Sequence, residues 1–92
     1  MKLEAAGRPG GCKLIRLSAE LEGTLIRSMS IRGDFFASPE EGFDRVEERL
    51  RDIPVEALGP CFDRLLAEEG VETQGIDGRG LSQVLRSALA GD

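Results

Sequence analysis

Apolar and polar residues alternate in the first third of the chain, and this spacing predicts β-strands. Over residues 12–21 the apolar residues Ile15, Leu17 and Ala19 fall at every second position. Such a strand has one apolar face and one polar face. Residues 24–32 repeat the pattern after a Glu22-Gly23 turn, so the two segments are predicted to form a β-hairpin.

The second predicted strand departs from strict alternation at one point. Met29 and Ile31 keep the period of two, but Ile26 falls out of phase with them. A β-bulge near Arg27-Ser28 would add one residue and bring Ile26 onto the same apolar face. We therefore expect a bulge in this strand.

A strand pattern changes to a helix pattern just after the hairpin. Residues 33–36 predict a short third strand or an extended corner. Ser38 is expected to cap the following helix, Pro39 fits the first helical position, and Glu41 completes a capping box. The segment around residues 31–40 is therefore the junction between a sheet and a helical half.

Apolar residues recur at helical spacing in the rest of the chain. The first helix is expected to reach about residue 51, with its charged residues, Glu47 among them, on a solvated face. Pro60 is expected to interrupt the second helix, which continues over residues 60–69. Residues 72–80 are predicted to be a polar loop, and a last amphipathic helix follows over residues 81–89.

These segments predict an α+β fold in one domain, residues 1–92. A small antiparallel sheet, made of the hairpin and the short third strand, would be followed by two to three helices packed on one face. A hairpin with one apolar face is not stable alone and needs this cover. Residues 1–6 fit either a short strand or a frayed arm, and residues 7–11 fit a turn.

Composition narrows the possible functions. The formal net charge is −5, which argues against a general nucleic-acid binder because phosphate neutralisation requires a surplus of Lys and Arg. The chain contains no His, so a Ser-His-Asp or Cys-His catalytic site is not possible within it. A metal site is not expected either. No apolar run has the length of a membrane span and the N-terminus lacks a signal-peptide pattern, so we expect a cytoplasmic protein with reduced cysteines.

Two motifs together resemble a known family. Pro9-Gly10-Gly11 is followed closely by Lys13-Leu14, and Gly33-Asp34-Phe35-Phe36 is followed by Pro39-Glu40. This arrangement resembles the C-terminal accessory domain of lipoate–protein ligases, well over residues 8–51 and only as a helical pattern beyond. Cys12 is a departure, because the family runs Gly-Gly directly into Lys. Either the turn is one residue longer here, or Cys12 takes a place of its own in the strand.

The resemblance implies a fold and a function. The fold would be a two-layer α+β arrangement similar to that of the SufE and NifU proteins. In some organisms these ligases are split, and this chain matches the small subunit. It would not be active alone and would hold no catalytic residue and no cofactor of its own. Docked on the large catalytic subunit, it would support formation of lipoyl-AMP from lipoate and ATP with magnesium. Lipoyl-domain acceptor proteins would be indirect partners.

The candidate site consists of residues expected to face the partner or the adenylate. Lys13 could face the partner or the adenylate, or it could be a plain solvated lysine. Asp34 could contact the partner, or its carboxylate could accept hydrogen bonds from backbone N–H groups and hold the corner. The two adjacent phenylalanines should point to opposite faces, one into the core and one outward. The full set is Gly10, Gly11, Lys13, Arg16, Gly33, Asp34, Phe35 and Phe36.

Two other functions stay open from the sequence. One is a sulfur acceptor or iron–sulfur assembly scaffold that uses Cys61. The other is a regulatory binding module that keeps the fold but has lost the ligase role. We expect Cys12 and Cys61 to be small buried hydrophobic residues instead of reactive thiols.

Overall fold

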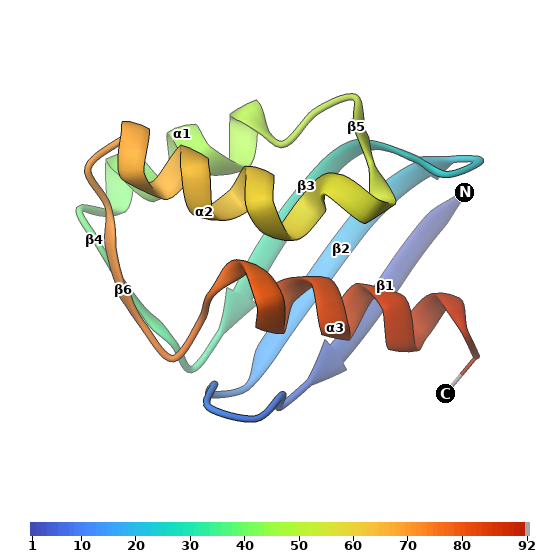
Figure 1. Cartoon of the computed structure of the whole chain (residues 1–92), viewed down its shortest axis with the longest axis horizontal. Coiled ribbons are helices and arrows are strands. Elements are labelled where there is room, and N and C mark those ends of the chain that lie inside the picture. Colours follow the sequence, from blue (N-terminus) through green and yellow to red (C-terminus); the bar gives the residue numbers. More distant parts are fainter. Residues whose placement is uncertain (92) are drawn as a thin grey trace.

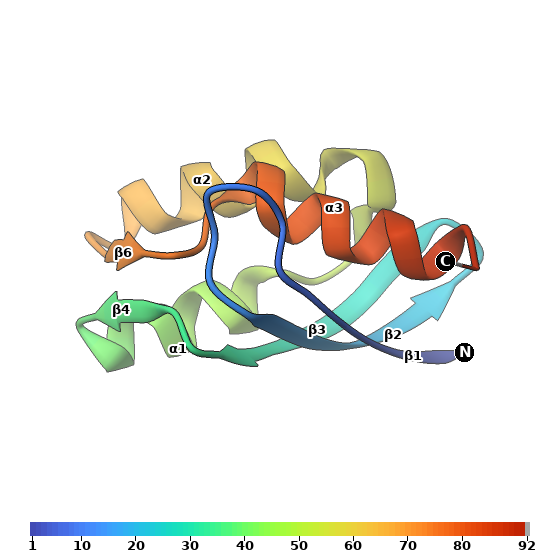
Figure 2. The same ribbon diagram turned by 90° about the horizontal axis from the view of Figure 1, so that it is seen from below.

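The computed structural model, which describes residues 1–91, contains a four-stranded antiparallel sheet with helices on one side (Figure 1). The strand order is β1-β2-β3-β5. Helices α2 and α3 lie over one face of the sheet, and α1 lies beside β3. Figure 2 shows that no other element of residues 1–91 covers the opposite face. The strands are β1 (Lys2–Gly7), β2 (Ile15–Glu22), β3 (Leu25–Gly33), β4 (Phe36–Ser38), β5 (Ile53–Pro54) and β6 (Glu72–Gln74). The helices are α1 (Glu40–Arg49), α2 (Leu58–Glu68) and α3 (Gly78–Leu89), with a short 3-10 helix at Val55–Ala57.

The hairpin of β2 and β3 forms as predicted, including its bulge. Glu20 is opposite Ser28, whereas the next residue of β2 is opposite Ile26, so Arg27 is the extra residue. Ile26 is fully buried and Met29 is 6% exposed. The bulge therefore places both side chains in the core.

The N-terminal residues form a strand and not a frayed arm. Met1 and Leu21 exchange two main-chain hydrogen bonds of 2.7 Å, and β1 pairs with β2 along its whole length. Between these strands the Cys12 N–H donates to the Pro9 carbonyl at 3.0 Å. Because β2 begins only at Ile15, Cys12 belongs to a longer turn and does not shift the register of the strand.

The core lies between the apolar face of the hairpin and the helices. Phe62 of α2 is fully buried, and its ring meets that of Phe43 edge-to-face with centroids 6.2 Å apart. Residues from the sheet and from all three helices join it, among them Ile15, Ile31, Val46, Leu58, Leu65, Leu81 and Leu85. The helices thus supply the cover that the hairpin requires. No helix of residues 1–91 is both long and apolar enough to cross a membrane.

The predicted capping box of α1 is wrong. Ser38 lies in β4, where it is paired with Glu72 of β6, and the helix begins two residues later. Pro39, joined to Ser38 by a cis peptide bond, holds the N-cap position, where no side chain forms a capping hydrogen bond. Pairing between distant segments has overridden a local helix-start pattern.

The predicted polar loop over residues 72–80 is also wrong in part. It contains β6 and the start of α3, and the third strand pairs with β6 instead of with the hairpin. Asp77 caps α3, since its carboxylate accepts a hydrogen bond of 2.7 Å from the Gly80 N–H. Polar residues here serve a strand and a helix cap.

Glu47 does not belong to a solvated face. Its side chain is only 13% exposed, and it accepts a 2.6 Å hydrogen bond from the Ile31 N–H of β3. The same carboxylate oxygen lies 3.2 Å from the Arg32 guanidinium. Helix α1 thus satisfies an N–H group at the edge of β3 that would otherwise lack a partner.

We predict that Glu47→Ala lowers the free energy of unfolding by about 1–3 kcal/mol, because it leaves a partly buried N–H group without an acceptor. Glu47→Gln keeps an acceptor oxygen and should lose less. Urea unfolding followed by circular dichroism measures both. The exposed neighbour Glu48 is the control, and Glu48→Ala should change the free energy by no more than about 0.5 kcal/mol. Equal losses at the two positions would contradict this role of Glu47.

Ion pairs join the outer surfaces of α1 and α2. Arg45 lies 2.7 Å from Glu69, and Arg49 lies 2.7 Å from Glu68 and 3.2 Å from Glu69. The hydrogen bond from Arg45 lowers the pKa of Glu69 below its usual range, and Arg49 adds to this effect. Glu69 is therefore more acidic in the folded chain than in the unfolded chain.

A lowered folded-state pKa means that Glu69 stabilises the fold above its unfolded pKa of about 4.5. This contribution should be lost as the pH falls through the lower folded-state value. We predict that Glu69→Gln has a lower urea midpoint than the wild type at pH 7, and that the difference shrinks toward zero below about pH 4. Glu56→Gln, which removes an exposed carboxylate, is the control. A difference that stays constant from pH 7 to pH 3 would refute the assignment.

Candidate functional site

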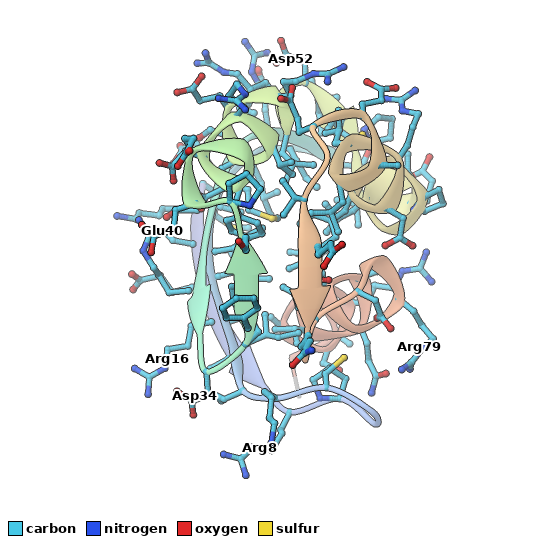
Figure 3. All side chains as sticks on the ribbon, turned by 90° about the vertical axis from the view of Figure 1, so that its left-hand side faces the viewer. Arg8, Arg16, Asp34, Glu40, Asp52 and Arg79 are labelled. Atoms are coloured by element: carbon cyan, nitrogen blue, oxygen red, sulfur yellow. The ribbon has the colours of Figure 1, made fainter. Side chains whose placement is uncertain are left out.

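Three hydrogen bonds gather distant segments at one end of the molecule. The Lys13 N–H donates to the Gly75 carbonyl at 2.8 Å, and the Asp34 N–H donates to the Leu14 carbonyl at 3.0 Å. The Arg79 guanidinium of α3 donates to the Gly10 carbonyl at 2.5 Å. The glycine turn, the start of β2, the corner after β3 and the start of α3 therefore meet here. Arg8, Arg16, Asp34 and Arg79 lie at this end in Figure 3.

Most residues predicted for the site lie at this end. Gly10 and Gly11 form the turn, and Gly33 and Asp34 form the corner. Phe36 of β4 is opposite Gln74, the residue next to Gly75. We call this surface the basic end, and it comprises Arg8, Gly10, Gly11, Lys13, Arg16, Arg32, Gly33, Asp34, Phe36 and Arg79.

Only a residue without a side chain fits at position 33. Its φ is +153°, and a side chain there would run into the Leu14 carbonyl. The absence of a side chain lets the corner close on the start of β2. The bond that holds this closure is the main-chain one from Asp34.

The Asp34 carboxylate does not lock the corner, which corrects the prediction. The side chain is exposed, and within residues 1–91 it accepts no hydrogen bond from a backbone N–H group. The carboxylate points outward (Figure 3). It is therefore free to contact another molecule.

The two phenylalanines divide as expected, and the structure identifies the exposed one. Phe35 is partly buried, and its ring centroid lies 5.6 Å from that of Phe43. Phe36 is 59% exposed. Phe36 is therefore the aromatic side chain of this corner that is available for contact with another molecule.

Lys13 lies beside β6 and not on the open sheet face. Its aliphatic chain packs against Gly75, whose φ of +88° and lack of a side chain leave the space for it. Lys13 is exposed and makes no ion pair with any other residue of the described chain. Its ammonium group is therefore available to an anion.

Arg16 lies round the corner from the turn, on the bare face of the sheet. It is directly opposite Arg32 in the register of β2 and β3. Like charges in this position repel each other, and Glu47 offsets only Arg32. The two arginines line a shallow hollow whose floor includes Ala6, Ser18 and Ser30.

The charge of this end is opposite in sign to that of the whole chain. It holds five of the twelve basic residues, namely Arg8, Lys13, Arg16, Arg32 and Arg79, although the net charge is −5. Arg8, Arg32 and Arg79 were not among the site residues predicted from the sequence. Arg79 is 69 positions from Gly10, so no local pattern signals their contact.

Nothing in the described structure favours a sulfur-handling site at the cysteines. Both are partly buried and pack against the core, so the prediction of small buried hydrophobic residues is met in part. Cys12 lies in the turn before β2 and Cys61 in α2. Burial, and then the negative charge of Asp77 3.8 Å away, raises the pKa of the Cys12 thiol and so lowers its thiolate fraction. Within residues 1–91 no group of three or more potential metal ligands comes together.

Comparison with known proteins gives one sequence match and one structural match, both from Thermoplasma acidophilum. No family model matches the chain. The sequence is 36% identical over 73 residues to "Lipoate-protein ligase A subunit 2" of Thermoplasma acidophilum, covering 79% of this chain and 77% of that protein. The fold matches, with a TM-score of 0.72 and 29% identity, a chain from the solved structure of an archaeal lipoylation system. That structure is described as a bi-partite lipoate protein ligase and its E2 lipoyl domain from Thermoplasma acidophilum, and the match covers 92% of this chain and 97% of that one.

We predict that the corner depends on Gly33 and not on the Asp34 side chain. Gly33→Ala should lower the free energy of unfolding by about 1–3 kcal/mol, because a side chain at this φ strains the backbone and meets the Leu14 carbonyl. Asp34→Ala should change it by no more than about 0.5 kcal/mol. Urea unfolding of the two variants in parallel measures this. A larger loss for Asp34→Ala than for Gly33→Ala would show that the carboxylate holds the corner after all.

Proposed function

The chain belongs to the family of lipoate–protein ligase A subunit 2, and we propose that it acts as the accessory subunit of a two-part lipoate–protein ligase. The observation that carries this proposal is a shared sequence and a shared fold over most of both chains. In this role the chain docks on a separate large subunit that carries out the chemistry. A cytoplasmic location fits this role, because the reaction consumes ATP.

The basic end is the docking surface in this proposal. Phe36 is the anchor, since aromatic residues in desolvated pockets contribute much of the binding energy at interfaces. The surrounding cations, Lys13 and Arg79 among them, favour a negatively charged surface on the partner and increase the rate of association. Asp34 is the one exposed carboxylate of the corner and would accept a hydrogen bond or an ion pair from the partner.

The proposed contribution to the reaction is closure of the active site of the complex. Lipoate, ATP and magnesium are bound in the complex and not by this chain alone. The lipoate carboxylate attacks the α-phosphorus of ATP, and the bond to the leaving pyrophosphate breaks, which gives lipoyl-AMP. Closure over this mixed anhydride excludes water and protects it from hydrolysis.

Lys13 and the glycine turn are the groups of this chain closest to such a role. A cation held on a fixed turn stabilises phosphate charge where water is excluded. Among residues 1–91, Lys13 makes no ion pair with a carboxylate, and its main chain is fixed by Gly75. Transfer of the lipoyl group to a lipoyl-domain acceptor protein remains with the large subunit, so the acceptor is an indirect partner.

The experiment measures the first half-reaction with and without this chain. The large subunit is incubated with lipoate, ATP and magnesium, and lipoate-dependent pyrophosphate release is followed. We expect a low rate from the large subunit alone and a much higher rate with an equimolar amount of this chain. Equal rates under the two conditions would refute the proposal.

Phe36→Ala tests the docking surface. We predict that it weakens binding to the large subunit about 30-fold, the loss of about 2 kcal/mol typical of a hot-spot aromatic. Calorimetry measures the affinity, and pyrophosphate release should recover when the variant is added in excess. The control is Leu89→Ala, since Leu89 is also a large exposed apolar residue, at 43% exposure. Unchanged affinity for Phe36→Ala, or an equal loss for both variants, would exclude Phe36 as the anchor.

A further inference from the structure

The outer edge of β1 has no neighbouring strand. β1 is the first strand in the sheet order, and its only partner is β2. Met1 and Leu21 exchange hydrogen bonds, so the main-chain N–H and C=O groups of every second residue, starting at Met1, are directed toward β2. The N–H and C=O groups of Lys2, Glu4 and Ala6 therefore point away from the sheet, and all three residues are exposed.

The other long edge of the sheet is partly covered, by β5 at one end and by α1 along the rest, unlike the edge of β1. At the edge of β3, helix α1 packs alongside and Glu47 accepts the hydrogen bond of Ile31. At β1 there is instead an open groove between the strand and helix α3. Its lining is mixed. Leu3 and Ala5 on the strand and Val84 and Ala88 on the helix are small or apolar, whereas Glu4, Arg8 and Gln83 are polar. Exposed strand edges of this kind pair readily with another strand.

We propose that β1 pairs, antiparallel, with β1 of a second copy of this chain about a two-fold axis at Leu3. In this register Lys2 faces Glu4 of the second copy, and Glu4 faces its Lys2, so two opposite-charge pairs form. Lys2 and Glu4 of both copies also form main-chain hydrogen bonds across the axis with their outward N–H and C=O groups. Charge complementarity of the strand with itself is what identifies the second copy as the occupant.

Neighbouring registers are disfavoured by charge. An axis at Glu4 places two Glu4 carboxylates opposite each other, and an axis at Ala5 places Lys2 opposite Arg8 of the second copy. Like charges directly opposite each other destabilise a strand pair. An axis at Ala6 would also pair opposite charges, Glu4 with Arg8, but Arg8 lies beyond the end of β1. The axis at Leu3 is the one that pairs opposite charges with both residues inside the strand.

The pairing also buries apolar surface on the helix side. Leu3 is partly buried and packs against the core, and at the two-fold axis it meets Leu3 of the second copy. The small residues Ser87 and Ala88 leave room for this contact in the groove. The glycine turn and Phe36 lie toward the other end of β1, so the proposed docking surface stays free in the dimer.

Charge reversal tests the dimer and its register. Sedimentation equilibrium of the full chain over a wide concentration range should show a reversible monomer–dimer equilibrium for the wild type. Lys2→Glu and Glu4→Lys should each weaken dimerisation about tenfold or more, because each reversal turns both symmetric pairs into like-charge pairs. The double variant Lys2→Glu with Glu4→Lys should restore it. Glu56→Lys, a reversal at an exposed site on the 3-10 helix, should have no effect.

A cross-link gives a second, independent measurement. In a background with Cys12→Ser and Cys61→Ser, Leu3→Cys should form an interchain disulfide on mild oxidation, because the two residues meet at the axis. Ala5→Cys should not, since it would face Met1 of the second copy. A monomer at all concentrations, or no rescue by the double variant, would overturn the proposal. A third result would also overturn it: the chain is monomeric, and Lys2→Glu or Glu4→Lys abolishes binding to the large subunit. The edge of β1 would then belong to the interface with the large subunit.

Discussion

The structure depends on the one-sided character of the β2–β3 hairpin. Its apolar face cannot remain in water, and all three helices contribute side chains to cover it. The bulge at Arg27 serves the same burial of the apolar face, because it places the Ile26 side chain in the core together with that of Met29. The polar face carries Arg16, Ser18 and Ser30, which tolerate exposure, so no element is needed there. Burial on one side therefore leaves a flat face, a strand edge and one end of the sheet available for contact with other chains.

Local patterns predicted the parts of the fold that local forces decide. The hairpin, its bulge and the positions of the three helices follow from spacing, since burial of one strand face or one helix stripe requires that spacing. The capping box failed because Ser38 pairs with Glu72, 34 positions away, and main-chain pairing outweighed a side-chain cap. For the same reason β6 could not be recognised in a short polar segment. Glu47 was misplaced because its partner, the Ile31 N–H, is an unpaired group on another element.

The candidate site was predictable in composition but not in arrangement. The glycine turn and the Gly33–Phe36 corner were found from the sequence, and they do lie at the same end. Which phenylalanine is exposed depends on the face that β4 presents once it pairs with β6, and this pairing is not visible locally. The role of Asp34 was assigned to the wrong atoms, because its N–H holds the corner and its carboxylate does not. Arg79 reaches Gly10 only because α3 returns over the sheet, so its contribution could not be read from neighbouring residues.

Net charge alone gives a misleading picture of how this chain meets a partner. A formal charge of −5 suggests repulsion from any acidic surface. At physiological ionic strength, however, the screening length is about 8 Å, whereas the longest axis of the molecule is 32 Å. A partner approaching the basic end therefore responds mainly to the local cations there, and the carboxylates around α1 and α2 are largely screened. Because the basic end carries five cations and the carboxylate of Asp34, the chain as a whole remains acidic while presenting a local cationic surface around Phe36. If a partner presents an acidic surface, as proposed above, the local cations attract it to this end and favour one orientation of docking before any side chain makes contact.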